Sequence, residues 1–218
     1  FGDGMMTYWI AALVLMALLA VEELENAKKM KGLVGRTLVL EVNAAPDLRD
    51  AMRIIVTRVK LALEADVCSV YLADNERQQY VLSATDGYRQ NAVAEVRLDF
   101  GEGLVGVIAE REEPLNLEDA NTHPRYRMSR DTGEEVYHGF LGVPIIQHRK
   151  VLGVLVVRRL TQARFSDDDE TFLLTLAAQL AGAISHAEAS GDIDQMLQDS
   201  TDGQYSLDGI GGAPGVAI

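Results

Sequence analysis

Apolar residues recur at helical spacing in two stretches of this chain. The first covers residues 48–63 and the second residues 172–184, and in each an apolar residue returns every three or four positions. Asp47 and Ser166 stand in the N-cap position before these stretches, and four acids follow Ser166 where the first turn of a helix favours them. The pattern predicts two amphipathic helices, with a shorter one over residues 38–44 before the first.

Between the two helices the pattern changes to that of strands. Short runs of apolar residues are separated by turn residues, such as Asp74-Asn75. The runs at 140–146 and 151–157 are almost entirely apolar, which is typical of central strands that are covered on both faces. The predicted strands are 67–72, 80–84, a short one starting at 96, 114–120, 140–146 and 151–157, with a helix near 101–110 between the third and fourth.

The order of these elements predicts an α+β fold, arranged as an α/β/α sandwich. Its central antiparallel sheet carries the N-terminal and C-terminal helices on one face and short elements on the other.

A glycine-rich segment, Gly101-Glu-Gly-Leu-Val-Gly106, opens the helix near 101–110. Two interpretations are open: an anion cradle at the start of a helix, or a tight turn with close packing. No lysine follows as it does in a phosphate-binding loop, so we favour the turn.

A polar loop over residues 121–138 is the longest irregular stretch inside the predicted fold. Ordered loops of this length often act as lids or binding loops. An arginine in such a loop can clamp a carboxylate through two parallel hydrogen bonds. The loop holds His123, Arg125, Tyr126, Arg127, Arg130 and Tyr137.

Charge and cysteine content exclude several classes of protein. The net charge of −13 argues against nucleic-acid binding, because it leaves no basic stripe to face phosphates. The single cysteine, Cys68, excludes a disulfide within the chain and suits a reducing compartment. Cys68 lies inside an apolar run, which favours a buried thiol over a reactive one.

The sequence contains no catalytic signature. There is no nucleophile elbow, and the four histidines lack metal-ligand spacing and a cysteine partner. We therefore predict no catalytic residue, no metal site and no cofactor within these 218 residues.

Both ends of the chain differ from its centre. Residues 5–21 are apolar apart from one threonine, which is the lower limit for a membrane span. Either a membrane anchor or a buried, dimer-forming helix accounts for them. Residues 188–208 hold six acids and no base, and residues 209–218 are glycine-rich and end in an apolar triplet. This end is interpreted as the start of a further domain, with a disordered terminus as the alternative.

Several segments, in order, resemble a GAF domain between about residues 36 and 190. The resemblance is most specific to the GAF domain of the nitrogen-related phosphoenolpyruvate-protein phosphotransferases, enzyme I of the nitrogen phosphotransferase system. Residues 209–218 also resemble the opening of the phosphotransferase region in those enzymes. The segments that carry the GAF resemblance are EVNAAPDL (41–48), DVCSVYLAD (66–74), GEGLVG (101–106), PLNLEDA (114–120), FLGVPII (140–146) and LGVLVV (152–157).

The resemblance implies a domain organisation for the whole chain. Residues 1–32 form an apolar segment without a counterpart in the family, 33–190 the GAF domain, 191–208 an acidic linker, and 209–218 the start of a truncated phosphotransferase region. It implies a cytoplasmic protein, although membrane anchoring through residues 5–21 stays open. The phosphorylated histidine of the family lies beyond this chain, so the chain itself is not expected to be an enzyme.

The resemblance also implies a regulatory site between the sheet and the elements on its loop side. Its ligand would be a nitrogen-status metabolite, glutamine or 2-oxoglutarate, that controls autophosphorylation of the phosphotransferase region. Strand alternation sends Ser69 and Tyr71 to one face and Cys68 to the other. The expected site residues are Ser69, Tyr71, Ala84, Val105, Leu117, Asp119, Arg125, Tyr126, Arg127, Tyr137 and Phe140, with Arg130 as a further candidate.

Further partners follow from the same resemblance. They are the chain's own phosphotransferase region, a phosphocarrier protein for the parent enzyme, Mg²⁺ for the missing catalytic region and a second copy in a homodimer. The alternative function is a scaffold that binds no small molecule and dimerises through its first and last helices.

Overall fold

The computed structural model describes residues 16, 22, 25, 32–89, 92–127 and 136–193. The chain divides into two compact units, Phe1–Thr37 and Leu38–Ile218, and the described residues of the second unit form the domain considered below. Residues 32–43 are helical. The predicted apolar segment 5–21 lies outside the described residues except for Met16, and so do the linker beyond residue 193 and residues 209–218.

Within the described ranges, no helix is both long enough and apolar enough to cross a membrane.

The second unit is built on one six-stranded sheet whose neighbouring strands all run antiparallel. The strand order is β3-β2-β1-β6-β5-β4, so that β1 and β6 lie at the centre. The elements are α2 (Leu48–Ala62), β1 (Val67–Asp74), β2 (Gln79–Asp86), β3 (Arg97–Asp99), α3 (Gly103–Arg111), β4 (Leu115–Leu117), the 3₁₀ turn η2 (Ala120–Thr122), β5 (Gly139–Gln147), β6 (Lys150–Arg159) and α4 (Asp167–Ser190).

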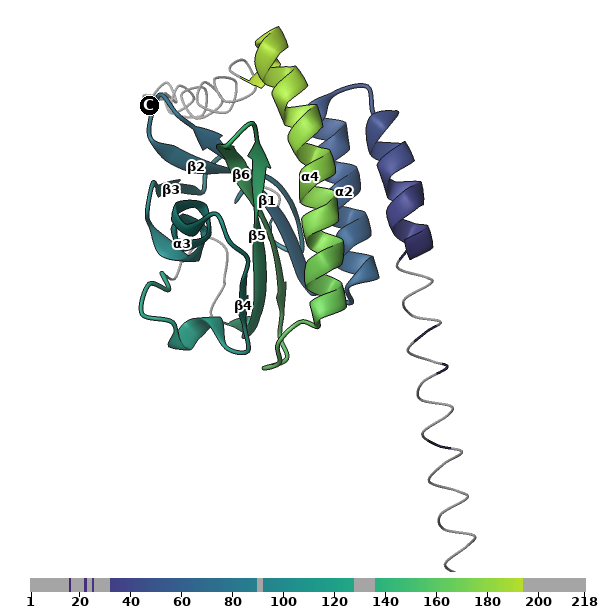
Figure 1. Cartoon of the computed structure of the whole chain (residues 1–218). Coiled ribbons are helices and arrows are strands. Elements are labelled where there is room, and N and C mark those ends of the chain that lie inside the picture. The colour runs from purple at the N-terminus through teal and green to yellow at the C-terminus, as the bar shows by residue number, and fades with distance from the viewer. Residues whose placement is uncertain are drawn as a thin grey trace, which may run out of the picture. The chain divides into compact units, whose positions relative to one another are not determined.

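Helices cover the two faces of the sheet unequally (Figure 1). The long helices α2 and α4 lie together on one face, and the short helix α3 covers the other. This arrangement confirms the predicted α+β sandwich. We refer below to the side covered by α3 as the α3 face.

Both predicted N-caps are confirmed. The Asp47 carboxylate accepts a hydrogen bond of 2.8 Å from the backbone N–H of Asp50 at the start of α2. At the start of α4, Ser166 and Asp169 form a reciprocal capping box, with bonds of 3.2 and 2.9 Å. Each cap satisfies a backbone donor that has no partner within its helix, which fixes where the helix begins.

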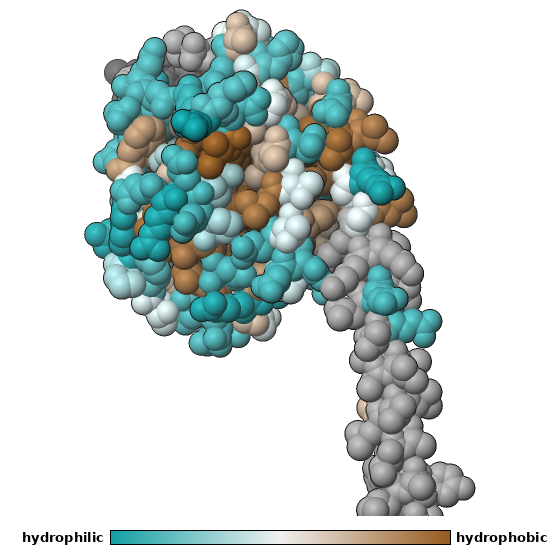
Figure 2. All heavy atoms as spheres, viewed as in Figure 1, coloured by the Kyte–Doolittle hydropathy of each residue, from teal (hydrophilic) through white to brown (hydrophobic). Residues whose placement is uncertain are grey.

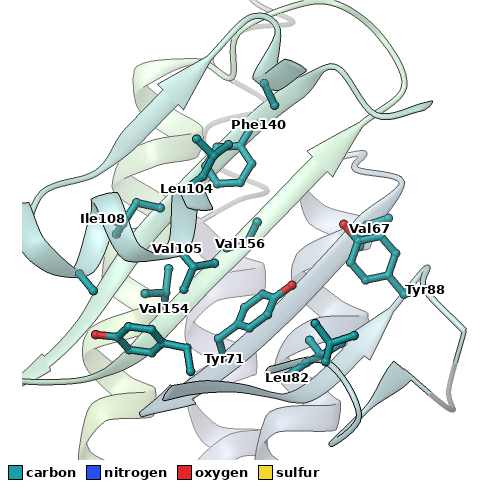
Figure 3. Close-up of a cluster of buried hydrophobic side chains, with 14 of the residues drawn as sticks. Val67, Tyr71, Leu82, Tyr88, Leu104, Val105, Ile108, Phe140, Val154 and Val156 are labelled. Atoms are coloured by element: carbon teal, nitrogen blue, oxygen red, sulfur yellow. The ribbon is translucent and has the colours of Figure 1, made fainter. Parts of the chain in front are cut away.

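Apolar side chains fill the α3 face of the sheet (Figure 3). Leu104, Val105 and Ile108 point from α3 toward side chains of the central strands. Burial of this surface anchors the short helix to the sheet, and its first turn becomes one wall of the site described below. The strand residues of the cluster that Figure 3 labels are Val67, Tyr71, Leu82, Phe140, Val154 and Val156.

Glycine at position 153 allows the two central strands to approach each other. Gly153 of β6 pairs with Leu72 of β1. A β-carbon at position 153 would lie far inside van der Waals distance of the Tyr71 carbonyl oxygen. That oxygen belongs to the backbone of a central strand, so a side chain at 153 could be accommodated only by displacing the ladder.

We expect Gly153→Ala to lower the free energy of unfolding by about 1–3 kcal/mol through overpacking. Gly182→Ala is the matched control, because Gly182 is exposed on α4 with open space around its would-be β-carbon. The control should raise stability by about 0.5–1 kcal/mol, as for any exposed helix glycine. Urea unfolding monitored by circular dichroism measures the free energy of unfolding of both variants. Equal changes in the two variants would contradict the close approach of the strands at Gly153.

Candidate functional site

A cavity of about 220 Å³ lies on the α3 face. Strand β1, the edge strand β3, the first turn of α3, the loop after η2 and the end of β6 contribute to it. Most of its lining elements are far apart in the sequence, so the cavity exists only in the folded domain. The lining residues are Tyr71, Val96, Arg97, Leu98, Glu102, Gly103, Leu104, Val105, Tyr126, Arg127 and Arg158.

A buried arginine forms the inner part of the cavity. Arg158 is only 6% exposed. It pairs with Val67 across β1 and with Phe140 across β5, and both partners belong to the apolar cluster on the α3 face. Its guanidinium carbon lies 5.4 Å from the centre of the Phe140 ring and 5.8 Å from that of Tyr126. The two rings provide cation–π contacts that hold a positive charge against the cavity.

Two groups of opposite charge lie nearer to solvent. Arg127 is exposed, and Glu102 is half-buried. The Glu102 carboxylate already accepts a hydrogen bond of 3.1 Å from the backbone N–H of Asp99, which places it at the turn before α3. A ligand in the cavity would therefore meet a buried cation at its inner end and both signs of charge at its outer end.

Arg97 lines the cavity without aiming its charge into it. The register of β3 pairs Arg97 with Val81 and Leu98 with Tyr80. Tyr80 and Leu98 belong to or pack on the cluster of the α3 face, so alternation sends the Arg97 side chain to the other face. There its guanidinium lies 3.8 Å from the buried carboxylate of Asp74.

The glycines before and within α3 serve turning and close packing. Gly101 and Gly103 have φ angles of +82° and +64°, which side chains rarely adopt. A β-carbon on Gly106 would collide with the backbone of Gly101. The segment is thus a compact turn, as the sequence indicated, and it delivers Leu104 and Val105 to the cavity wall.

Four of the residues expected from the sequence line this cavity: Tyr71, Val105, Tyr126 and Arg127. The expected candidate Arg130 lies outside the described residues. The remaining expected residues have other surroundings, which the next paragraphs describe.

Ser69 and Ala84 do not line the cavity, for two different reasons. Ser69 lies on the α3 face but is buried, and its hydroxyl is 2.9 Å from that of Thr85. Ala84 was expected on the same face, and the register corrects this. Ala84 pairs with Val70 while Leu82 pairs with Tyr71, so a bulge at Ser83 turns Ala84 to the opposite face.

Arg125 is engaged in contacts at the protein surface. Its guanidinium donates to Glu110 at 2.6 Å and also to the carbonyl oxygen of Gly101. The hydrogen bond from Arg125 and its positive charge lower the pKa of Glu110 despite some desolvation. Arg125 therefore does not line the cavity.

Asp119 forms a separate polar cluster at the end of β4. Its carboxylate lies 3.2 Å from Nδ1 of His138 and accepts a hydrogen bond of 3.0 Å from the backbone N–H of Asn121. Desolvation opposes the ionised form, but these hydrogen bonds outweigh it and lower the pKa of Asp119. The bonds fasten the 3₁₀ turn η2 to the segment that enters β5.

The last three expected residues belong to the apolar cluster on the α3 face or pack against it. Leu117 and Tyr137 are partly buried against the apolar cluster, and Tyr137 packs edge-on against Tyr88 with ring centres 5.9 Å apart. Phe140 is fully buried beneath Arg158.

Arg158 is the most buried charged group of the cavity, and it is not among the residues expected from the sequence. The predicted strand ended at Val157, two residues before the end of β6 at Arg159, and so left Arg158 out. Alternation along β6 would have revealed it, because Val154, Val156 and Arg158 share one face.

The described residues offer little reactive chemistry. Burial raises the pKa of the Cys68 thiol, which keeps it protonated and unreactive. Within the described ranges, no group of three or more His, Cys, Asp or Glu side chains is placed to hold a metal ion.

Comparisons with known proteins agree with this architecture. Residues 47–184 match the family model of the GAF domain. The chain is 41% identical over 183 residues to the protein of Salmonella typhimurium named phosphoenolpyruvate-dependent phosphotransferase system. It is 30% identical over 179 residues to the Nif-specific regulatory protein of Herbaspirillum seropedicae, a match that covers 75% of this chain and 32% of that protein.

A solved structure gives the same result. The GAF domain from the phosphoenolpyruvate-protein phosphotransferase (ptsP) of Coxiella burnetii superposes with a TM-score of 0.73 and 45% sequence identity, over 76% of this chain and 98% of that domain. The match to the Salmonella protein covers 84% of this chain but only 24% of that relative, so this chain spans about a quarter of its length. The resemblance to the GAF domain of such phosphotransferases is thereby confirmed.

The contact between Arg125 and Glu110 predicts a measurable titration. We expect the Glu110 carboxyl to titrate below its ordinary pKa in the wild-type chain, and at a higher pH in Arg125→Gln. Because the folded-state pKa is lowered, the stability that the pair contributes is present above the unfolded pKa and is lost as the pH falls through the folded value. Carbon-detected NMR titration of the side-chain carboxyl checks this; identical midpoints in the two proteins would refute it.

Proposed function

Because the chain belongs to the GAF domain family, which residues 47–184 match, we propose that it is the regulatory sensor domain of a phosphoenolpyruvate-protein phosphotransferase. In this proposal the cavity on the α3 face binds a small nitrogen-status metabolite, glutamine or 2-oxoglutarate. Binding then controls autophosphorylation of the phosphotransferase region. The observation that carries the proposal is the buried guanidinium of Arg158 at the inner end of the cavity.

A guanidinium in this position selects for an anion. Its planar fork of donors matches the two oxygens of a carboxylate. The rings of Phe140 and Tyr126 surround it with material of low polarity, where the attraction between opposite charges is stronger than in water. A carboxylate that enters the cavity would therefore be drawn to Arg158.

The size of the cavity limits the ligand to a small metabolite. A volume of about 220 Å³ is below the range of roughly 300–1,000 Å³ that is typical of pockets for larger ligands. Glutamine and 2-oxoglutarate both carry a carboxylate for Arg158. At the outer end, Arg127 suits the second carboxylate of 2-oxoglutarate, whereas Glu102 suits the ammonium group of glutamine.

Regulation requires that the ligand bind two states of the protein with different affinities. Helix α4 packs on β5 and β6, and Arg158 lies near the end of β6, so the helix and the cavity share one sheet. In the sequence, α4 is followed by the acidic segment 191–208. We propose that this segment passes the bound state on to the phosphotransferase region, which would need Mg²⁺ and a phosphocarrier protein. The similarity to a Nif-specific regulatory protein supports a regulatory role.

Isothermal titration of the chain with 2-oxoglutarate and with glutamine tests the proposal. We expect at least one of them to bind, and Arg158→Met to weaken that binding tenfold or more, because a hydrogen bond to a charged group contributes about 1.5–3 kcal/mol. Arg164→Gln is the control, since Arg164 is exposed and does not line the cavity. Circular dichroism verifies that each variant is folded. Absence of binding by both compounds, or unchanged affinity in Arg158→Met, would rule out the proposed site.

The alternative function, a dimerisation scaffold, is favoured by apolar side chains on the outer surfaces of the long helices. Leu61 of α2 is 66% exposed and Leu174 of α4 is 37% exposed. Figure 2 shows that most of the described surface on its side of the molecule is hydrophilic, with smaller apolar areas between. Exposed leucines on adjacent helices are suited to a helix–helix interface.

If the chain forms a homodimer through these helices, a substitution that disrupts the interface should lower its mass in solution. We expect sedimentation of the wild-type chain as a dimer, and of Leu174→Glu as a monomer, because a buried charge without a partner opposes association. Leu160→Glu provides the control, since Leu160 is 50% exposed but lies outside both helices. A monomeric wild-type chain would remove the scaffold function.

A further inference from the structure

Two walls of the cavity come from separate parts of the chain and meet at one arginine. One wall is the turn into α3, where Glu102 and Gly103 line the cavity immediately after Gly101. The other is the loop after η2, where Tyr126 and Arg127 line the cavity immediately after Arg125. The side chain of Arg125 spans from the second wall to the first.

The contacts of Arg125 form a clasp of three hydrogen bonds. One terminal nitrogen donates to Glu110 Oε2 at 2.6 Å. The other donates to Glu110 Oε1 at 3.3 Å and to the carbonyl oxygen of Gly101. Glu110 lies near the end of α3 and Gly101 lies before its start, so a single guanidinium ties the loop to both ends of the helix. We call this set of contacts the Arg125 clasp.

The surroundings of the Arg125 clasp are shaped to receive it. A β-carbon at Gly101 would lie 2.7 Å from Glu110 Oε1 and 3.6 Å from the terminal nitrogen of Arg125. The lack of a side chain at this position therefore leaves space for the carboxylate and the guanidinium to meet. Lysine could not replace the arginine, because an ammonium group lacks the planar fork that reaches a carboxylate and a carbonyl together.

The loop that carries Arg125 is a tight turn. The backbone N–H of Arg125 donates to Nδ1 of His123 at 3.2 Å, and the N–H of Tyr126 donates to the carbonyl of His123 at 2.9 Å. Since these bonds couple neighbouring residues, a displacement of Arg125 would carry Tyr126 with it. Tyr126 is one of the two rings beside Arg158.

We propose that Arg125 is a positioning residue that holds the loop wall closed over the cavity and so sets ligand affinity without touching the ligand. This inference rests on the proposed function of the cavity. The Arg125 and Glu110 side chains are 42% and 51% exposed, and ion pairs at such exposure are weak enough to open and reform. Apparent affinity falls in proportion to the fraction of molecules in which the wall is closed.

The experiment combines hydrogen exchange without ligand and titration with 2-oxoglutarate as the probe. In Arg125→Gln we expect faster exchange at the Tyr126 amide, and a dissociation constant raised about tenfold if only about a tenth of the molecules keep the wall closed. We expect Arg125→Lys to show the same faster exchange and the same weaker binding as Arg125→Gln, because the Arg125 clasp depends on the planar guanidinium. The midpoint of thermal unfolding should change little, since the ion pair is exposed.

Arg53→Gln is the matched control. Arg53 forms an exposed ion pair with Asp50 at 2.6 Å, the same length as the shortest bond of the Arg125 clasp, but on α2. It should leave both exchange at Tyr126 and the dissociation constant unchanged. An effect of Arg53→Gln equal to that of Arg125→Gln would show that loss of any surface pair suffices, and would overturn the positioning role.

The two measurements separate this inference from the proposed function. Unchanged exchange at Tyr126 in Arg125→Gln overturns the clasp, whatever the titration shows. Faster exchange together with no binding of 2-oxoglutarate to the wild-type chain supports the clasp and counts against this ligand for the cavity. Faster exchange with an unaltered dissociation constant shows that the wall moves but does not control affinity, which overturns the proposal.

Discussion

The antiparallel pairing of β1 with β6 is the contact on which the rest of the domain depends. These strands occupy the centre of the sheet, and their register places Val67 opposite Arg158 and Tyr71 opposite Val154. The same pairing therefore decides which side chains share the α3 face. Gly153 permits the close approach of the two backbones. The lack of a side chain at this position therefore helps to keep the cavity-lining residues of β1 and β6 in register.

A sheet that is covered on both faces usually excludes charge from its interior. Here the end of β6 carries a guanidinium into an otherwise apolar layer, and the rings of Phe140 and Tyr126 accompany it. A charge in such a place is costly to bury and effective in binding, and both properties come from the same low polarity. The domain thus places one charged group in a core layer that is otherwise apolar, and the proposed anion site depends on this group.

The inner and outer walls of the cavity are held in place by different kinds of contact. Its inner end belongs to the central strands, which are held by a continuous ladder and by the apolar cluster. Its outer wall is a loop held by hydrogen bonds of exposed side chains, chiefly those of Arg125 with Glu110. Under the proposed function, this difference would let the outer wall move for a ligand while the central strands stay in place.

Much of the fold follows from local rules that the sequence states directly. Helical spacing and the caps at Asp47 and Ser166 determine where α2 and α4 begin, and the apolar runs determine which strands are central. The compact turn before α3 follows from its glycines, whose backbone angles side chains rarely adopt. The resemblance of ordered motifs identified the family. Four of the residues expected from the sequence, Tyr71, Val105, Tyr126 and Arg127, line the cavity.

The tertiary structure decided what depends on contacts between distant segments. The bulge at Ser83 turned Ala84 away from the expected face, because one extra residue in a strand reverses the alternation that a sequence pattern assumes. Arg125 and Arg127 look alike in the sequence, yet one meets Glu110 and the other lines the cavity. The sequence by itself determined the elements and their order, since spacing and capping act over a few residues. Which arginine faces the cavity was set only when strand register and loop packing brought residues from five separate segments together.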